Sequence, residues 1–339
     1  MAGSAATPST VQASSRAEDG SRAARAFGHL AWISLGYTVL VILFGAWVRI
    51  SGSGAGCGQH WPTCQGEVIP RAHSVQMAIE LTHRVTSGAS LLLVVALLVW
   101  AFRSFPRGHL ARRASVFAMA FMLGEALVGA ALVLLKLVGH NDSVARALVM
   151  GVHLANTFLL TGALAIAARS AHHPAPLGFR PRGFNWWLVA ALAGTLLLAM
   201  LGAITALGDT LHPLVESQGV AARLAADHSV TAGFLQRARE VHPVGAVLLA
   251  ALLFYLVSAL PQRHAGEEVR RGAIAVGTLV LVQIATGVVN IVLSAPGWMQ
   301  VVHLALATLL WIALVLLSTA ALAASPGSRV GSPAWTPPS

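Results

Sequence analysis

The sequence contains eight apolar runs, and each is long enough to cross a lipid bilayer as a helix. They cover residues 28–48, 75–101, 114–137, 147–168, 185–207, 241–260, 272–293 and 298–323. A helix of about 20 residues spans a hydrocarbon core of about 30 Å. Hydrophobic residues occupy 56% of the 339 positions and charged residues only 10%, a balance that a soluble domain does not need to fill its core. The sequence therefore predicts an all-α integral membrane protein with eight transmembrane helices.

The basic residues indicate how the chain crosses the membrane. The formal net charge is +10, and 14 of the 22 Lys and Arg residues lie before the first run, after the last, or beside the second, fourth and sixth connections. Basic residues near membrane spans favour the cytoplasmic side. We therefore expect both termini to be cytoplasmic, and the basic excess gives no support for a nucleic-acid partner. The Arg-rich composition suggests a GC-rich bacterial genome, so we expect the bacterial cell membrane.

The second half of the sequence repeats the first at offsets of 150 to 159 residues. The matching positions are Val-His-Leu-Ala at 152–155 and 302–305, Gly45 and Gly202, His83 and His242, Glu125 and Gln283, and Gly129 and Gly287. Four spans return the chain to its starting side, so this duplication is parallel, with a pseudo-axis along the membrane normal. The repeat predicts two tandem pseudo-symmetric four-helix bundles.

These observations divide the chain into five segments. We expect bundles at 28–171 and 185–323, joined by a cytoplasmic linker at 172–184. Residues 1–27 and 324–339 carry no apolar pattern, and we expect them to be disordered cytoplasmic tails.

Four histidines lie at matching depths within these spans. They are His83, His153, His242 and His303, each within about two turns of the outer start of an even-numbered run. An ionisable side chain within a membrane span is costly unless it has a partner. A single such histidine often makes only an interhelical hydrogen bond, but four histidines related by a repeat favour a ligand-binding site. Two imidazoles on facing helices of a four-helix bundle can ligate haem iron, whereas zinc requires four close ligands. The sequence predicts two haem pairs near the outer face, His83 with His153 and His242 with His303.

Acidic residues make the two halves unequal. Glu80 precedes His83 by three positions and shares its helix face, whereas Glu240 precedes its histidine by two and points elsewhere. A carboxylate beside haem can accept a proton or stabilise a developing cation. The alternative is a salt bridge from Glu80 to Arg84, and Arg84 can equally hold a haem propionate. Glu125, within the third run, is expected to face the bundle interior, either protonated and hydrogen-bonded or in a proton path to the first haem site.

The first outer loop holds the chain's two cysteines, Cys57 and Cys64. On the oxidising side of the membrane a disulfide is the default expectation, and in a tight, exposed loop it can be structural or redox-active. A metal site of both cysteines with His60 is the less favoured alternative.

Several motifs together resemble one known family. They are Gly-Ala-Trp-Val-Arg at 45–49, Ser-Gly-Ser-Gly at 51–54, the cysteine loop at 57–64, Glu80-x-x-His83-Arg84, Gly-Asp-Thr-Leu at 208–211 and His242-Pro243. Over residues 28–323 the chain resembles haem A synthase. The resemblance implies oxidation of the C8 methyl of haem O to a formyl group, giving haem A for terminal cytochrome oxidases.

The resemblance also implies roles for particular residues. His83 and His153 would ligate the substrate haem, Glu80 would be the catalytic acid, and His242 and His303 would ligate a resident haem b. Cys57 and Cys64 match an outer-loop disulfide. The implied partners are haem O and the lipid bilayer, with a haem O synthase and further copies of the chain as open candidates.

The sequence departs from the family pattern at two places. The loop at 208–239 lacks the cysteine pair that some members carry, and Glu125 stands where we expected an amide. The main alternative function is a bis-histidine di-haem membrane cytochrome b that acts only in electron transfer. Glu80 beside one pair alone favours an enzyme, because electron transfer would not require it. A haem transporter is a third alternative, and a channel is disfavoured because the polar groups cluster at one depth.

Overall fold

The protein is an all-helical membrane protein in the part of the chain that the structure describes. The computed structural model describes residues 8–68, 70–172, 183–213, 227, 233–264 and 266–323. Within them, eight helices are long and apolar enough to cross a membrane. These helices are α1 (Pro8–Ile50), α2 (Val75–Ser104), α3 (Leu110–Leu134), α4 (Val144–His172), α5 (Asn185–Leu211), α7 (Phe234–Arg263), α8 (Glu267–Val292) and α9 (Gly297–Ala323). All eight predicted spans are confirmed.

The helices extend beyond several of the predicted limits. Helix α1 begins at Pro8, so residues 8–27, which we expected to be a disordered tail, are helical in the structure. That segment contains several Ala and Arg residues, which have high helix propensity, and it continues directly into the first apolar run. Residues 1–7 and 324–339 of the predicted tails, and 173–182 of the predicted linker, lie outside the described residues.

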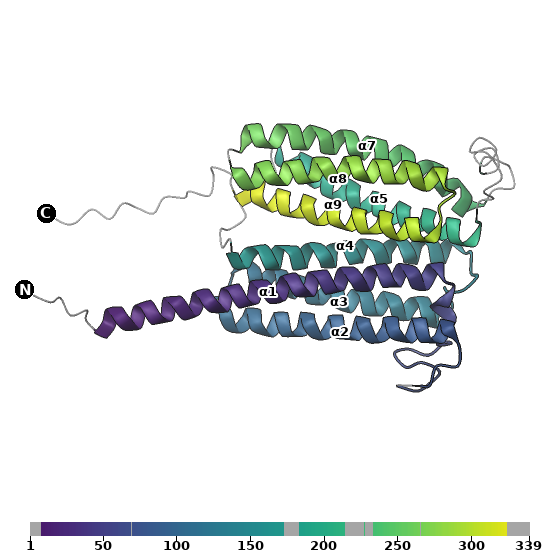
Figure 1. Cartoon of the computed structure of the whole chain (residues 1–339), viewed down its shortest axis with the longest axis horizontal. Coiled ribbons are helices and arrows are strands. Elements are labelled where there is room, and N and C mark those ends of the chain that lie inside the picture. Colours follow the sequence, from purple (N-terminus) through teal and green to yellow (C-terminus); the bar gives the residue numbers. More distant parts are fainter. Residues whose placement is uncertain are drawn as a thin grey trace, which may run out of the picture.

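The helices form two tandem bundles with equivalent neighbours. In the first, α1 contacts α2 and α4, and α3 contacts both α2 and α4; in the second, α5, α7, α8 and α9 make the same set of contacts in the same order. Figure 1 shows the two bundles side by side, with their helices running along the long axis of the molecule. Helix α1 begins and α9 ends at one end, which we call the inner end. The α1–α2 loop lies at the opposite end, which we call the outer end.

The bundles meet along α1 and α4 of the first and α5 and α9 of the second. The indole of Trp311 on α9 stacks on Phe158 of α4 at a centroid distance of 5.6 Å, and its Nε1 donates to the Phe158 carbonyl at 2.5 Å. A Cβ at Gly162 would lie 3.3 Å from that Nε1. Small residues let membrane helices approach closely, and lipid offers the indole N–H no acceptor in the hydrocarbon core. This contact therefore joins the two bundles.

Candidate functional site

The four histidines predicted to be ligands lie on α2, α4, α7 and α9, one pair in each bundle. They are His83, His153, His242 and His303, and each is half-buried. The ring centroids of His242 and His303 are 6.4 Å apart, at an interplanar angle of 76°. The Nδ1 atom of each of the four rings is buried and has no hydrogen-bond partner among the described residues. A buried polar atom without a hydrogen bond is costly, and His153 differs from the other three in that a carboxylate oxygen of Glu125 lies 3.2 Å from its Nδ1.

A glycine on the first helix of each bundle lies against one of these rings. A Cβ added to Gly45 on α1 would lie 3.0 Å from Cε1 of His83. A Cβ added to Gly202 on α5 would lie 3.0 Å from Cε1 of His242. Any larger residue would press on the imidazole, so the absent side chain lets the helix backbone approach it closely. The repeat predicted from the sequence is therefore present in the packing around the histidines.

The second histidine of each pair contacts the repeat-related residue of the preceding helix. Oε2 of Glu125 on α3 lies 3.2 Å from Nδ1 of His153. Nε2 of Gln283 on α8 lies 3.1 Å from Nε2 of His303. The two bundles thus place a carboxylate and an amide at equivalent positions.

Polar side chains of α4 hold Glu125 in place. Nδ2 of Asn156 donates to its Oε1 at 2.5 Å, and the hydroxyl of Thr157 lies 3.1 Å from both carboxylate oxygens. Glu125 therefore faces α4 and its histidine, as expected from the cost of exposing it to lipid. At the corresponding positions, α9 carries Leu306 and Ala307. Sequence reasoning missed Asn156 and Thr157, although their spacing of three and four residues after the histidine puts them on its face.

The two cysteines form the predicted disulfide at the outer end of the first bundle. The Cys57–Cys64 bond is closed, and both residues are fully buried against Met77 of α2. A Cβ on Gly56 would lie 2.6 Å from the backbone of α2 at Gln76, so glycine allows the loop to pack directly on the helix. The alternative metal site that used both cysteines is wrong, because the disulfide occupies both sulfurs.

Glu80 and Arg84 tie this loop to α2. The backbone N–H of Cys57 donates to Oε2 of Glu80 at 2.8 Å, and Nη2 of Arg84 donates to Oε1 at 2.5 Å. Nη1 of Arg84 donates to the carbonyls of His60 and Thr63 at 2.6 and 2.5 Å. Glu80 is only 4% exposed. The Glu80–Arg84 salt bridge is therefore present, while the catalytic role of Glu80 and the propionate contact of Arg84 stay predictions.

The second bundle has an arginine where the first has Glu80, three residues before the first histidine of its pair. Nε of Arg239 lies 2.8 Å from Oδ1 of Asp209, and Nη1 lies 3.1 Å from Oδ1 of Asp227. Its Nη2 also donates to the His212 carbonyl. Both bundles therefore tether the outer segment between their first two helices from the same helical position, but with opposite charge.

The side chain of Arg49 joins the two bundles at the outer end. Nη1 of Arg49, at the end of α1, donates to the Ala206 carbonyl of α5 at 2.6 Å and to the hydroxyl of Thr210. Its Nη2 donates to Oε1 of Gln300 on α9 at 2.9 Å. Sequence reasoning missed Arg49 and Arg239 as structural residues. Both lie on the outer side, where the positive-inside rule predicts few arginines, and that location could have indicated a structural role.

Comparison with known proteins gives one family and several relatives. A family model described as cytochrome oxidase assembly protein matches residues 28–315. The chain is 46% identical over 295 residues to a Thermus thermophilus protein named protoheme IX farnesyltransferase, a match that covers 86% of this chain and 48% of that protein.

Shorter matches reach proteins named heme A synthase. The chain is 36% identical to one from Lysinibacillus sphaericus over 109 residues, covering 31% of this chain and 36% of that protein. It is 38% identical to one from Bacillus cereus over 95 residues, covering 28% and 30% respectively. The chain spans about half the length of the Thermus relative that it matches.

Proposed function

Because the chain belongs to the family of cytochrome oxidase assembly proteins, we propose that it is a haem A synthase, which oxidises the C8 methyl of haem O to a formyl group. The observation that carries this proposal is the unequal pair of histidine sites. Each bundle offers two imidazoles with a glycine against one ring, but only the first carries a glutamate three residues before its first histidine, Glu80, and a carboxylate against its second, that of Glu125.

The residues of both bundles fit a haem. Paired imidazoles from facing helices would provide axial ligands, and in each bundle a buried Nδ1, that of His83 or His303, has no hydrogen-bond partner among the described residues. Gly45 and Gly202 let a helix backbone lie directly against the rings of His83 and His242. We assign the substrate haem to His83 and His153, and a resident haem b to His242 and His303. The haem b would supply a one-electron carrier for the substrate site.

The residues of the first bundle have separate tasks in this proposal. Oxidation of a methyl group removes protons as well as electrons, so the substrate site needs a proton acceptor. Glu80 lies one helical turn outward of His83 on the same face of α2, and it is buried. We propose that Glu80 takes up a proton there, while Arg84 neutralises its charge and can turn to a propionate. Glu125, whose Oε2 lies 3.2 Å from Nδ1 of His153, would orient that ring.

We also propose an orientation and a division of the chain. The inner end carries most of the arginines, so the positive-inside rule favours cytoplasmic termini and places the histidine sites near the outer face of the cell membrane. The division into bundles at 28–171 and 185–323 is supported by the helix contacts, because each set of four consecutive helices makes the same set of contacts. A reporter enzyme fused after Ser104 and one fused after Ser294 should report opposite sides of the membrane.

The Thermus relative suggests a partner. Its name describes transfer of a farnesyl group to protohaem IX, and this chain matches just under half of it. A farnesylated haem is the substrate that we assign to the first bundle. We therefore propose a haem O synthase as the protein that supplies it.

One alternative function has support from a specific contact. Both oxygens of Glu80 are already engaged in holding the disulfide loop, which is a structural task. If that is its whole task, the protein is a bis-histidine di-haem cytochrome b that only transfers electrons.

The decisive experiment supplies haem O to the purified protein with a reductant and oxygen, and follows the porphyrins by mass-resolved chromatography. We expect haem O to be consumed, with the alcohol appearing before haem A. Unchanged haem O with a stable two-haem spectrum would leave only the cytochrome. A parallel sample contains protohaem and farnesyl diphosphate. Farnesylation of protohaem in that sample would show that this chain has the activity for which the relative is named.

A variant separates the structural and catalytic tasks of Glu80. Glu80→Gln should retain both haems and lose conversion by on the order of 100-fold, because the amide still accepts from Cys57 but cannot take up a proton. Glu67→Gln changes an exposed carboxylate of the same loop and is the control. Full activity in Glu80→Gln would remove the catalytic role.

A further inference from the structure

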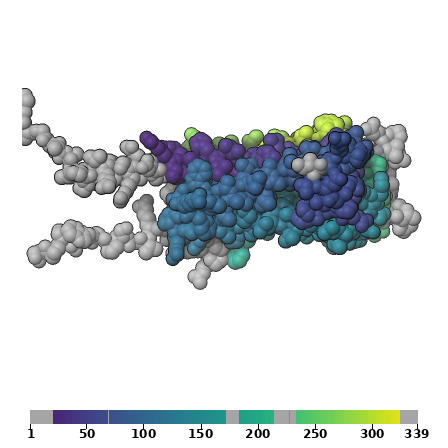
Figure 2. Space-filling model, turned by 90° about the horizontal axis from the view of Figure 1, so that it is seen from below, coloured from purple at the N-terminus to yellow at the C-terminus, as the bar shows by residue number. Residues whose placement is uncertain are grey.

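The inner end of the first bundle carries a surface groove between α2 and α3. Its volume is about 270 Å³. It is lined by Phe102, Arg107, Gly108, Arg112, Arg113, Val116 and Phe117. Figure 2 looks onto the face of the molecule that α2 and α3 form, with the inner end on the left. The groove opens on the outside of the bundle, so in a membrane it would face lipid.

The arginines of this groove lack acidic partners. Arg107, Arg112 and Arg113 contact no carboxylate within the described side chains. The Arg112 guanidinium lies over the Phe102 ring at 4.1 Å, and its Nη1 reaches the Phe105 carbonyl at 3.5 Å, which leaves most of its N–H donors unused. Three guanidinium groups therefore lie around an apolar groove, and no carboxylate of the described side chains neutralises them.

The arginines of the outer end provide a contrast. Arg49, Arg84, Arg146 and Arg239 each donate to at least one backbone carbonyl. Those side chains hold loops and helix ends together. Among the described residues, the arginines of the α2–α3 groove donate to no backbone carbonyl apart from the 3.5 Å contact of Arg112 with Phe105.

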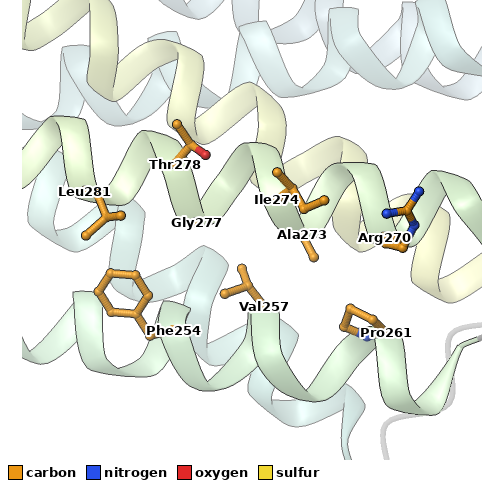
Figure 3. A pocket seen from close by; sticks show the side chains of 9 residues that line it. All are labelled: Phe254, Val257, Pro261, Arg270, Ala273, Ile274, Gly277, Thr278 and Leu281. Carbon is orange, nitrogen blue, oxygen red and sulfur yellow. The ribbon is translucent and has the colours of Figure 1, made fainter.

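The second bundle has an equivalent groove between α7 and α8 with a different charge pattern. Figure 3 shows Phe254, Val257, Pro261 and Leu281 along its walls and Arg270 at one end. Its volume is about 400 Å³. Here Glu267 neutralises the charge, since it pairs with Arg270 at 2.8 Å and with Arg271 at 2.7 Å. The two grooves are alike in place and apolar lining, and they differ in net charge.

We propose that the α2–α3 groove binds an anionic phospholipid of the adjacent leaflet. Its acyl chain lies along Phe102, Val116 and Phe117, and its phosphate and anionic headgroup contact the three arginines. Helix α2 has 30 residues and is about 45 Å long, longer than a hydrocarbon core of about 30 Å, so its end reaches the headgroups. Basic pockets between helices at this depth suit anionic headgroups, and guanidinium binds phosphate in a bidentate manner. The α7–α8 groove takes an acyl chain without preference for headgroup charge.

The test uses the full chain in detergent and native mass spectrometry with two probes, dioleoyl phosphatidylglycerol and dioleoyl phosphatidylcholine. The wild type should bind phosphatidylglycerol at least about tenfold more tightly. One arginine near an anionic headgroup strengthens binding about fivefold, so R107Q/R112Q/R113Q should weaken phosphatidylglycerol binding by on the order of 100-fold. The matched control R263Q/R270Q/R271Q removes the same charge from the second bundle and should change it less than about threefold.

Two further samples keep the result decisive. R107K/R112K/R113K preserves the charge and should retain the preference for phosphatidylglycerol, which separates recognition from loss of fold. Inorganic phosphate at millimolar concentration should not compete, because it lacks the acyl chain. Equal binding of both lipids by the wild type, equal losses in both glutamine variants, or full competition by phosphate would each overturn the proposal.

Discussion

The two bundles have the same helix contacts and the same pair of glycines against histidines, but they differ at each polar position around them. The first has Glu80, a disulfide loop and Glu125 with its α4 partners. The second has Arg239 and Gln283 at the equivalent positions. Duplication therefore preserved the packing that holds two imidazoles, while the side chains that supply charge and protons diverged. Three predictions test this division of tasks.

Removal of one histidine from each bundle should have the largest effect. His83→Ala should lose the haem of the first bundle and abolish conversion of haem O, while His242→Ala should lose the haem b of the second. Each variant should retain about half of the haem absorbance of a fully loaded wild type. Pyridine haemochrome spectra with mass analysis of the extracted haem identify which one is lost. Loss of the same haem from both variants would show that the pairs are not separate sites.

Substitution of the glycines should have a smaller effect that is confined to one bundle. Gly45→Ala places a Cβ 3.0 Å from the His83 ring, and the resulting overpacking should weaken haem binding there by about 1–3 kcal/mol. Gly202→Ala should do the same in the second bundle. Haem titration by absorbance measures both. Gly129→Ala is the control, because a Cβ there would meet nothing within 4 Å. An equal loss in the control would mean that helix packing in general, and not the ring contact, is affected.

Exchange of the carboxylate at position 125 for an amide, and of the amide at position 283 for a carboxylate, should have the smallest effect. It should change the redox potentials of the haems. A negative charge near haem iron stabilises the oxidised form, so Glu125→Gln should raise the midpoint potential of the first haem. Gln283→Glu should lower that of the second. Potentiometric titration followed by absorbance gives both midpoints. Unchanged potentials in both variants would remove the proposed role of these two residues.

Much of the fold was predictable because its signals are local or repeated. The eight spans follow from the lengths of the apolar runs. The equivalence of Glu125 and Gln283 in the two bundles follows from the sequence offset between the two halves. The disulfide was expected because the chain has only two cysteines, seven residues apart. The helical extension of α1 to Pro8 was not predicted, because a polar segment rich in helix formers gives no apolar periodicity.

The sequence by itself determined the number of membrane helices, their duplication and the equivalent places of the four histidines along their helices, since hydrophobic length and repeat spacing are properties of the linear chain. Only the tertiary structure decided which groups the charged side chains contact. Arg49 donates to residues more than 150 positions away in the sequence. Glu80 accepts a hydrogen bond from the backbone N–H of Cys57, a group that every residue except proline carries, so the sequence does not indicate this contact. In a membrane, a polar group must find its partner within the protein, and that partner depends on which helices pack together.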